Sequence, residues 1–89
     1  MVKWTLKFNN KANKDAKLLK TAGLKQKTND ILAKIESNPF LIPPPFEKLS
    51  GMLSGFISRR INRQHRIVYE VSEGTNEIFV YAMYRHYQD

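Results

Sequence analysis

Hydrophobic and polar positions alternate at the start of the chain and again in its second half. Within residues 2–8, Val2, Trp4, Leu6 and Phe8 alternate with lysine and threonine. This alternation predicts a half-buried β-strand, because successive side chains of a strand point to opposite faces. The second half has the same character, interrupted by turn-forming Ser-Gly and Gly-Thr-Asn. The further strands predicted there cover residues 47–53, 56–62, 66–71 and 78–83.

Two helices are predicted between the first strand and the others. Asn9 or Asn10 can cap the first helix, since an asparagine side-chain oxygen accepts an N–H of the first turn. Gly23 is a suitable C-terminal stop. The second helix ends at Asn38-Pro39, because proline disfavours helical backbone in the residue before it. Apolar residues recur at helical spacing at Ala12, Ala16 and Leu19. One face of the second helix carries Leu24, Thr28, Ile31, Leu32 and Ile35.

These elements predict an α+β fold with the order β-α-α-β-β-β-β, in which an antiparallel sheet packs against a helical hairpin. The chain has 89 residues, which is room for a single domain over residues 1–89 with one modest core. A hydrophobic content of 42% is sufficient for a globular protein and argues against a disordered chain. An antiparallel sheet commonly leaves one face open to water, and we expect a ligand to bind there.

The pairing of strands 56–62 and 66–71 decides which arginines share that open face. If residues 63–65 form the loop, Asn62 lies opposite Arg66 and Arg60 lies opposite Val68. An even-numbered loop would place Arg66 among isoleucines, and burial of an unpaired charge is costly. We therefore expect Arg60 and Arg66 to converge on the open face, unless they pair with Glu70 or Glu73 as ordinary surface ions. The apolar face then carries Ile57, Arg59, Ile61, Ile67, Tyr69 and Val71.

The charge of the chain favours an anionic partner. There are 15 basic and eight acidic residues, for a formal net charge of +7. The lysines all lie between Lys3 and Lys48 and the arginines between Arg59 and Arg85. Arginine offers a planar fork for phosphate oxygens, so close phosphate contacts are expected in the second half. Nucleic acid, an acidic protein or a ribosome surface fits this charge, and so does a basic protein without a specific ligand.

Other classes of protein are disfavoured by composition. The absence of cysteine excludes disulfide scaffolds and thiolate zinc sites, and it favours a reducing, cytoplasmic location. The first eight residues lack the apolar run of a signal peptide. No segment approaches the roughly 20 apolar residues of a membrane span, so no membrane partner is expected.

Four motifs follow one another in the second half of the chain. They are Phe46-Glu47-Lys48-Leu49, the run Leu-Ser-Gly-Phe-Ile-Ser-Arg-Arg-Ile at 53–61, His65-Arg66-Ile67-Val68-Tyr69 and Tyr84-Arg85-His86-Tyr87. In order and spacing they resemble the Txe/YoeB toxins of the RelE/ParE toxin–antitoxin superfamily, over about residues 38–87. The resemblance implies a microbial-ribonuclease-like fold and a ribosome-dependent endoribonuclease that cuts mRNA in the A site without a metal or other cofactor. It also implies a cognate antitoxin, YefM/Axe-like, with an acidic C-terminal segment.

The resemblance also assigns roles to residues of this chain. Glu47 matches the general base, His86 the general acid and Arg66 the cation that stabilises the transition state. Arg60 and Tyr87 match residues that orient the RNA. These are residue types that RNA cleavage requires, since the 2′-hydroxyl needs a base and the departing 5′-oxygen needs an acid.

Two positions depart from the family pattern, at Ser50, where lysine is frequent, and at Gln64, where an acid is frequent. Lys48 is a candidate replacement for the missing cation, and Arg59 is a further candidate RNA contact.

The expected partners are the antitoxin, the 70S ribosome with mRNA, and a possible second copy of the chain. The alternative is a non-catalytic basic toxin or a nucleic-acid- or ribosome-binding module of the same superfamily, and a purely structural partner of an acidic protein is a third hypothesis.

Overall fold

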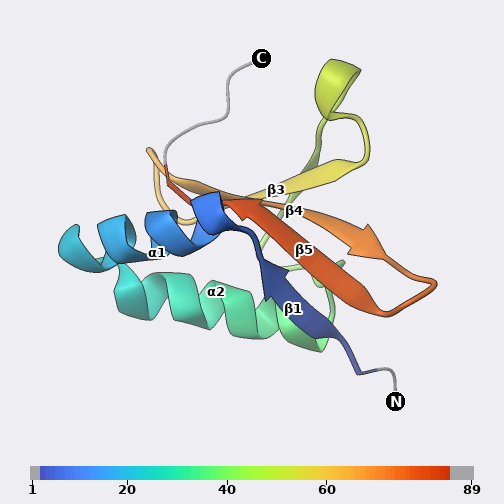
Figure 1. Cartoon of the computed structure of the whole chain (residues 1–89), viewed down its shortest axis with the longest axis horizontal. Coiled ribbons are helices and arrows are strands. Elements are labelled where there is room, and N and C mark those ends of the chain that lie inside the picture. Colours follow the sequence, from blue (N-terminus) through green and yellow to red (C-terminus); the bar gives the residue numbers. More distant parts are fainter. Residues whose placement is uncertain (1–2, 85–89) are drawn as a thin grey trace.

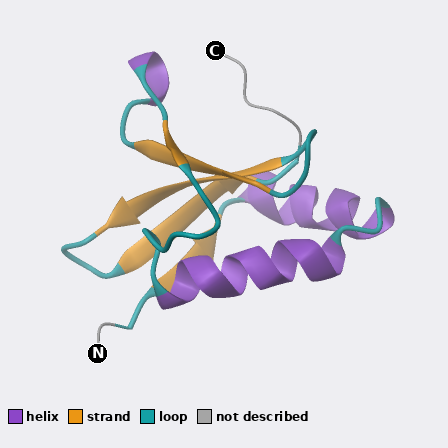
Figure 2. Cartoon of the chain, turned by 180° about the vertical axis from the view of Figure 1, so that it is seen from behind, coloured by secondary structure: helices purple, strands orange, loops and turns teal. Residues whose placement is uncertain are grey.

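Two helices cover one face of a five-stranded sheet in the computed structural model, which describes residues 3–84 (Figure 1). The elements are β1 (Thr5–Phe8), α1 (Asn10–Thr21), α2 (Lys25–Ser37), β2 (Glu47–Lys48), the 3-10 helix η1 (Gly51–Leu53), β3 (Phe56–Arg60), β4 (Arg66–Ser72) and β5 (Glu77–Ala82). The predicted α+β class and the order of helices and strands are confirmed. Seen from behind, α1 and α2 lie side by side, and η1 projects from the far end of the sheet (Figure 2).

The sheet is mixed, so the prediction of an antiparallel sheet is wrong at one edge. The strand order is β1-β5-β4-β3-β2, and three of the four pairs are antiparallel. The fourth pair is parallel, with Thr5 opposite Glu77 and Phe8 opposite Val80. Hydrophobic alternation shows which side chains of a strand are buried, but it carries no information about the direction of the neighbouring strand.

The register of β3 and β4 differs from the predicted one by two residues. Arg60, rather than Asn62, lies opposite Arg66. The cause is Asn62, whose side-chain oxygen accepts the backbone N–H groups of Gln64 and His65 at 2.8 Å each and draws residue 62 into the turn. A shift of two residues keeps every side chain on its face, so the predicted convergence of Arg60 and Arg66 on the helix-free face is confirmed.

The ends of both helices follow the predicted signals. The Asn9 side chain caps α1, with Oδ1 accepting the Ala12 N–H at 2.8 Å. Gly23 follows α1 with φ +78°, a left-handed conformation that glycine adopts without strain. The second helix ends at Ser37, one residue before Asn38 and Pro39.

The core lies between the helices and the sheet. Its buried members are Ala12, Leu19, Ile31, Ile35, Ile57, Ile61, Ile67, Tyr69, Ile78, Val80 and Met83. The predicted inward face of α2 is confirmed, whereas α1 differs at one position. Ala16 is exposed, and the neighbouring Asp15 is buried in its place. A carboxylate in that position requires polar partners, which are described below.

The predicted strand 47–53 is mostly absent. Only Glu47–Lys48 pair with β3, and the chain then turns at Gly51, whose φ is +65°. The Ser54 N–H bonds the Gly51 carbonyl at 3.1 Å and closes a short 3-10 turn. The Met52 side chain is fully exposed. The apolar residues of this segment led to the prediction of a strand, because a short apolar run does not distinguish a strand from a turn.

Candidate active site

Glu47 and Arg66 form an ion pair on the helix-free face of the sheet. They lie on β2 and β4, on either side of β3, where Ser58 pairs with both neighbouring strands. The Arg66 Nη1 atom is 2.6 Å from Glu47 Oε1 and 3.4 Å from Ser58 Oγ. The side chain of Glu47 is 67% exposed and that of Arg66 is 15% exposed. The carboxylate therefore faces solvent, while the guanidinium is held against the sheet.

The Arg66 side chain has a hydrogen-bond donor that the described residues leave unsatisfied. Its Nε atom is buried and has no hydrogen-bond partner among residues 3–84. A buried donor without an acceptor costs free energy, and a catalytic role is one of the explanations for such a group in a native protein. A guanidinium that is held in place suits a phosphate oxygen.

A shallow hollow of about 140 Å³ surrounds this pair. Its walls are Pro45, Phe46, Glu47, Ser58, Arg60 and Arg66. Arg60 is exposed at its edge. A hydrogen bond from Arg66, and then the charges of Arg66 and Arg60, hold the pKa of Glu47 below its usual value. The hollow therefore presents an ionised carboxylate beside two cations at neutral pH.

The structure contradicts the prediction that Arg59 contacts RNA. Arg59 is 1% exposed and lies on the core face. Its guanidinium donates to the Tyr69 hydroxyl at 2.9 Å and to the carbonyls of Pro39 and Pro44, and it lies 4.9 Å from the centre of the Phe46 ring. Burial raises the pKa of Tyr69, so its hydroxyl stays protonated and donates to Pro39 O at 2.7 Å. Arg59 holds the 39–46 segment against the sheet.

Lys48 is also directed away from the Glu47–Arg66 pair. It is the next residue along β2 and pairs with Ile57, so its side chain lies on the other face of the strand. It borders a separate hollow together with Gly55 and Glu73. The predicted replacement of the family cation by Lys48 is therefore not supported by its position.

The two remaining predicted site residues, His86 and Tyr87, lie outside the residues that the structure describes. Tyr84, the last of the described residues, packs against the core. Its ring stacks on His65, with 4.3 Å between ring centres and 21° between ring planes. His65 is buried in the turn before Arg66, which agrees with its predicted structural role.

Comparison with known proteins identifies the family. Residues 8–87 match the family described as YoeB-like toxin of bacterial type II toxin-antitoxin system. The chain belongs to this family. A structure of YoeB/ParE toxin from Agrobacterium tumefaciens is similar with a TM-score of 0.84 and 29% identity, covering 93% of this chain and 99% of that one. No curated protein sequence matches the chain.

Two structures from Staphylococcus aureus are similar to this YoeB-like toxin. A YoeB dimer gives 33% identity and a TM-score of 0.79, covering 96% of this chain and 99% of that one. A heterotetrameric YoeB-YefM toxin-antitoxin complex gives 32% identity and a TM-score of 0.78, with 94% and 98% coverage. This YoeB-like chain therefore has the fold of its family over nearly its whole length.

Two residues with polar contacts had no predicted role in this YoeB-like toxin. Ser58 was placed on the correct face by its register, and its hydroxyl lies beside Arg66. Asp15 had no sequence signal apart from its place between Ala12 and Leu19, on the inward side of α1. A charged residue at such a position is normally assigned to the surface, because burial of a charge requires partners that the sequence does not reveal.

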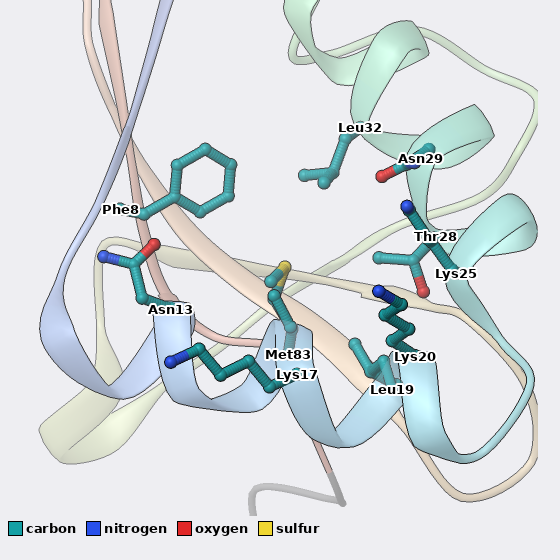
Figure 3. A pocket seen from close by; sticks show the side chains of 11 residues that line it. Phe8, Asn13, Lys17, Leu19, Lys20, Lys25, Thr28, Asn29, Leu32 and Met83 are labelled. Atoms are coloured by element: carbon teal, nitrogen blue, oxygen red, sulfur yellow. The ribbon is translucent and has the colours of Figure 1, made fainter.

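Another hollow of this YoeB-like toxin lies on the helical side, between α1, α2 and β1 (Figure 3). It measures about 320 Å³ and has apolar walls from Phe8, Leu19, Leu32 and Met83, with lysines at its margin. It is separated by the sheet from Glu47 and Arg66.

Within residues 3–84, no three His, Cys, Asp or Glu side chains gather as a metal-binding group. No helix in the same range has the length and apolar character needed to cross a membrane.

Proposed function

We propose that this YoeB-like toxin is a ribosome-dependent endoribonuclease that cuts mRNA in the ribosomal A site and so stops translation. The proposal is carried by one observation, the convergence of Glu47, Arg60 and Arg66 on one solvent-open hollow. A base and two cations that face solvent are part of what cleavage of an RNA strand at a phosphate requires, and an acid for the departing 5′-oxygen completes the set.

Glu47 acts as the general base in this proposal. Its carboxylate takes the proton of the 2′-hydroxyl, and the 2′-oxygen attacks the adjacent phosphorus. The bond from phosphorus to the 5′-oxygen then breaks, which leaves a 2′,3′-cyclic phosphate and a 5′-hydroxyl. The lowered pKa of Glu47 keeps it ionised and ready to accept the proton at neutral pH. A positioned base typically contributes about 10²–10⁴-fold to such a rate.

Arg66 and Arg60 stabilise the charge that accumulates on the phosphate oxygens. The Nη1 atom of Arg66 is engaged by Glu47 and Ser58, and its Nε atom has an unmet hydrogen bond within the described residues. A phosphate that binds Arg66 competes with Glu47 for the guanidinium. That exchange weakens the ion pair, raises the basicity of Glu47 and couples binding of the substrate to activation of the base.

His86 supplies the proton for the departing 5′-oxygen, and Tyr87 orients the RNA. Both roles come from the resemblance of the Tyr84-Arg85-His86-Tyr87 motif, since these two side chains lie outside residues 3–84. A histidine suits the role because its unperturbed pKa, near 6.5, lets it donate and recover a proton at physiological pH.

The partners in this proposal are the 70S ribosome with its mRNA and a cognate antitoxin. The similar Staphylococcus aureus protein was solved as a YoeB-YefM heterotetramer and as a YoeB dimer. We propose a YefM/Axe-like antitoxin whose acidic C-terminal segment covers the basic hollow, and homodimerisation of the free toxin. A net charge of +7 favours both the ribosome and the acidic segment.

The test compares variants on programmed ribosomes that carry a defined codon in the A site. Glu47→Ala and His86→Gln are each assayed by primer extension, beside Glu36→Ala, which removes an exposed carboxylate from α2 on the helical side. We expect both site variants to lose at least about 10²-fold in rate while the control cuts as the parent does. If both site variants cut like the parent, the mechanism is wrong. If the parent cuts nothing on ribosomes, the alternative of a non-catalytic basic toxin or binding module replaces the enzyme.

A further inference from the structure

The buried carboxylate of Asp15 holds the end of β5. Asp15 lies on α1 and is 3% exposed. Its Oδ2 atom accepts the backbone N–H of Met83 at 2.9 Å and that of Tyr84 at 3.3 Å. Both donors follow Ala82, the last residue of the strand. Asp15 therefore joins the first helix to the point at which the chain leaves the sheet.

Lys11 makes this buried charge tolerable. Its Nζ atom lies one helical turn before Asp15, at 2.8 Å from Oδ2 and 3.1 Å from Oδ1. The ammonium group neutralises the carboxylate and offsets part of the cost of its burial. An ionised acceptor also binds N–H donors more strongly than a neutral one does.

Tyr84 is held from a second direction by His65. The two rings stack at 4.3 Å, and His65 is itself 4% exposed in the turn between β3 and β4. The backbone of Tyr84 is thus attached to α1 and its ring to the turn that leads into Arg66. Two supports from different parts of the chain fix the position of residue 84 relative to the Arg66 side of the hollow.

We infer that Asp15 is a positioning residue for the proposed general acid. The inference rests on the proposed function, because His86 is the second residue after Tyr84. An acid has to come within hydrogen-bond reach of the oxygen that it protonates. Asp15 fixes the residue from which the chain continues to His86, and in this inference it acts without touching RNA. A displacement of 1 Å in such a group can cost about 10²-fold in rate.

The experiment measures the protonation step separately from the rest of the reaction. Ribosomes are programmed with an mRNA that has either oxygen or sulfur at the 5′-bridging position of the scissile bond. A thiolate leaves without a proton, so the sulfur substrate does not need the acid. We expect Asp15→Ala to cut the oxygen substrate about 10²-fold more slowly than the parent, and to cut the sulfur substrate at a rate close to the parent's.

Two further variants make the comparison specific. Asp15→Asn keeps one oxygen that can accept both backbone N–H groups, so it should recover most of the rate on the oxygen substrate. Asp30→Ala removes an exposed carboxylate from α2, where it accepts from Gln26, and should behave as the parent on both substrates. Only folded molecules cut, so the ratio of the two rates is independent of the fraction of each variant that is folded.

Each outcome decides the matter. If the ratio for Asp15→Ala equals that of the parent, or if this variant cuts neither substrate, Asp15 serves only the fold and the inference is overturned. If Asp15→Asn is as defective as Asp15→Ala, the backbone hydrogen bonds are not responsible, and the inference is again overturned. His86→Gln reports on the proposed function alone. If it cuts the oxygen substrate normally, or is not restored by sulfur, His86 is not the acid, whatever Asp15 does.

Discussion

Neighbouring arginines on β3 should respond in opposite ways to the same substitution. Arg59 is buried and bonds Tyr69, Pro39 and Pro44, whereas Arg60 is exposed beside the proposed site. Arg59→Met and Arg60→Met each remove a guanidinium and keep an unbranched apolar side chain of similar length. The pair therefore separates the polar contacts of an arginine from the packing of its stem.

The expected cost of Arg59→Met follows from the groups that lose their donor. Tyr69 still donates to the Pro39 carbonyl, so the loss falls mainly on the Pro44 carbonyl and on the bonds that the charged guanidinium made. An abandoned acceptor costs about 1–3 kcal/mol and a lost hydrogen bond to a charged group about 1.5–3 kcal/mol. Because the variant no longer buries a cation, part of this sum is recovered, and the net loss is about 2–4 kcal/mol. For a domain of this size the melting temperature falls by roughly 10–30 °C.

Arg60→Met should leave the free energy of unfolding within about 0.5 kcal/mol of the parent, because an exposed side chain is replaced. It should slow cleavage on programmed ribosomes instead. Urea unfolding followed by circular dichroism gives the stabilities, and cleavage is measured at a temperature at which both variants are folded. If Arg59→Met kept the parent's stability but lost cleavage, Arg59 would be an RNA contact and our account of its burial would be refuted.

Three other predictions concern the helix cap, the base and the C-terminus. Asn9→Ala removes the acceptor of the Ala12 N–H and should cost about 1 kcal/mol in urea unfolding, with cleavage per folded molecule unchanged; an unchanged stability would contradict the capping role. Because Arg66 lowers the pKa of Glu47, this carboxylate should become protonated only at a pH below 4.5, the usual pKa of a glutamate. Arg66→Met should raise the midpoint of an NMR titration of Glu47, and equal midpoints in the two proteins would refute the pairing. A chain that ends at Arg85 should melt near the parent's temperature and cut no mRNA, and cleavage by it would overturn the acid assignment.

The sequence was informative wherever a single element carried its own signal. The cap at Asn9, the stop at Gly23 and the inward face of α2 each depend on residues within one or two turns of helix. The convergence of Arg60 and Arg66 on one face also follows from local alternation, and it survived an error of two residues in the register. Such features are decided by near neighbours, so the sequence alone predicts them.

The partners of buried polar groups were not predictable in the same way. Arg59 and Lys48 look alike as basic residues in the family motifs, yet Arg59 is buried under the 39–46 segment and Lys48 faces solvent away from Glu47. Asp15 bonds to backbone groups 68 and 69 positions later in the chain. A charge can be buried only where distant groups satisfy it, and those groups are brought together only by the complete fold.

The sequence by itself therefore determined the class of the fold, the order of its elements and the family motifs. Tertiary structure decided the parallel direction of β1, the pairing of Glu47 with Arg66, and which basic residues reach the hollow. The physical reason is the range of the interactions. Hydrophobic periodicity and capping act between near neighbours, whereas strand direction, ion pairing and burial of charge depend on residues far apart in the chain.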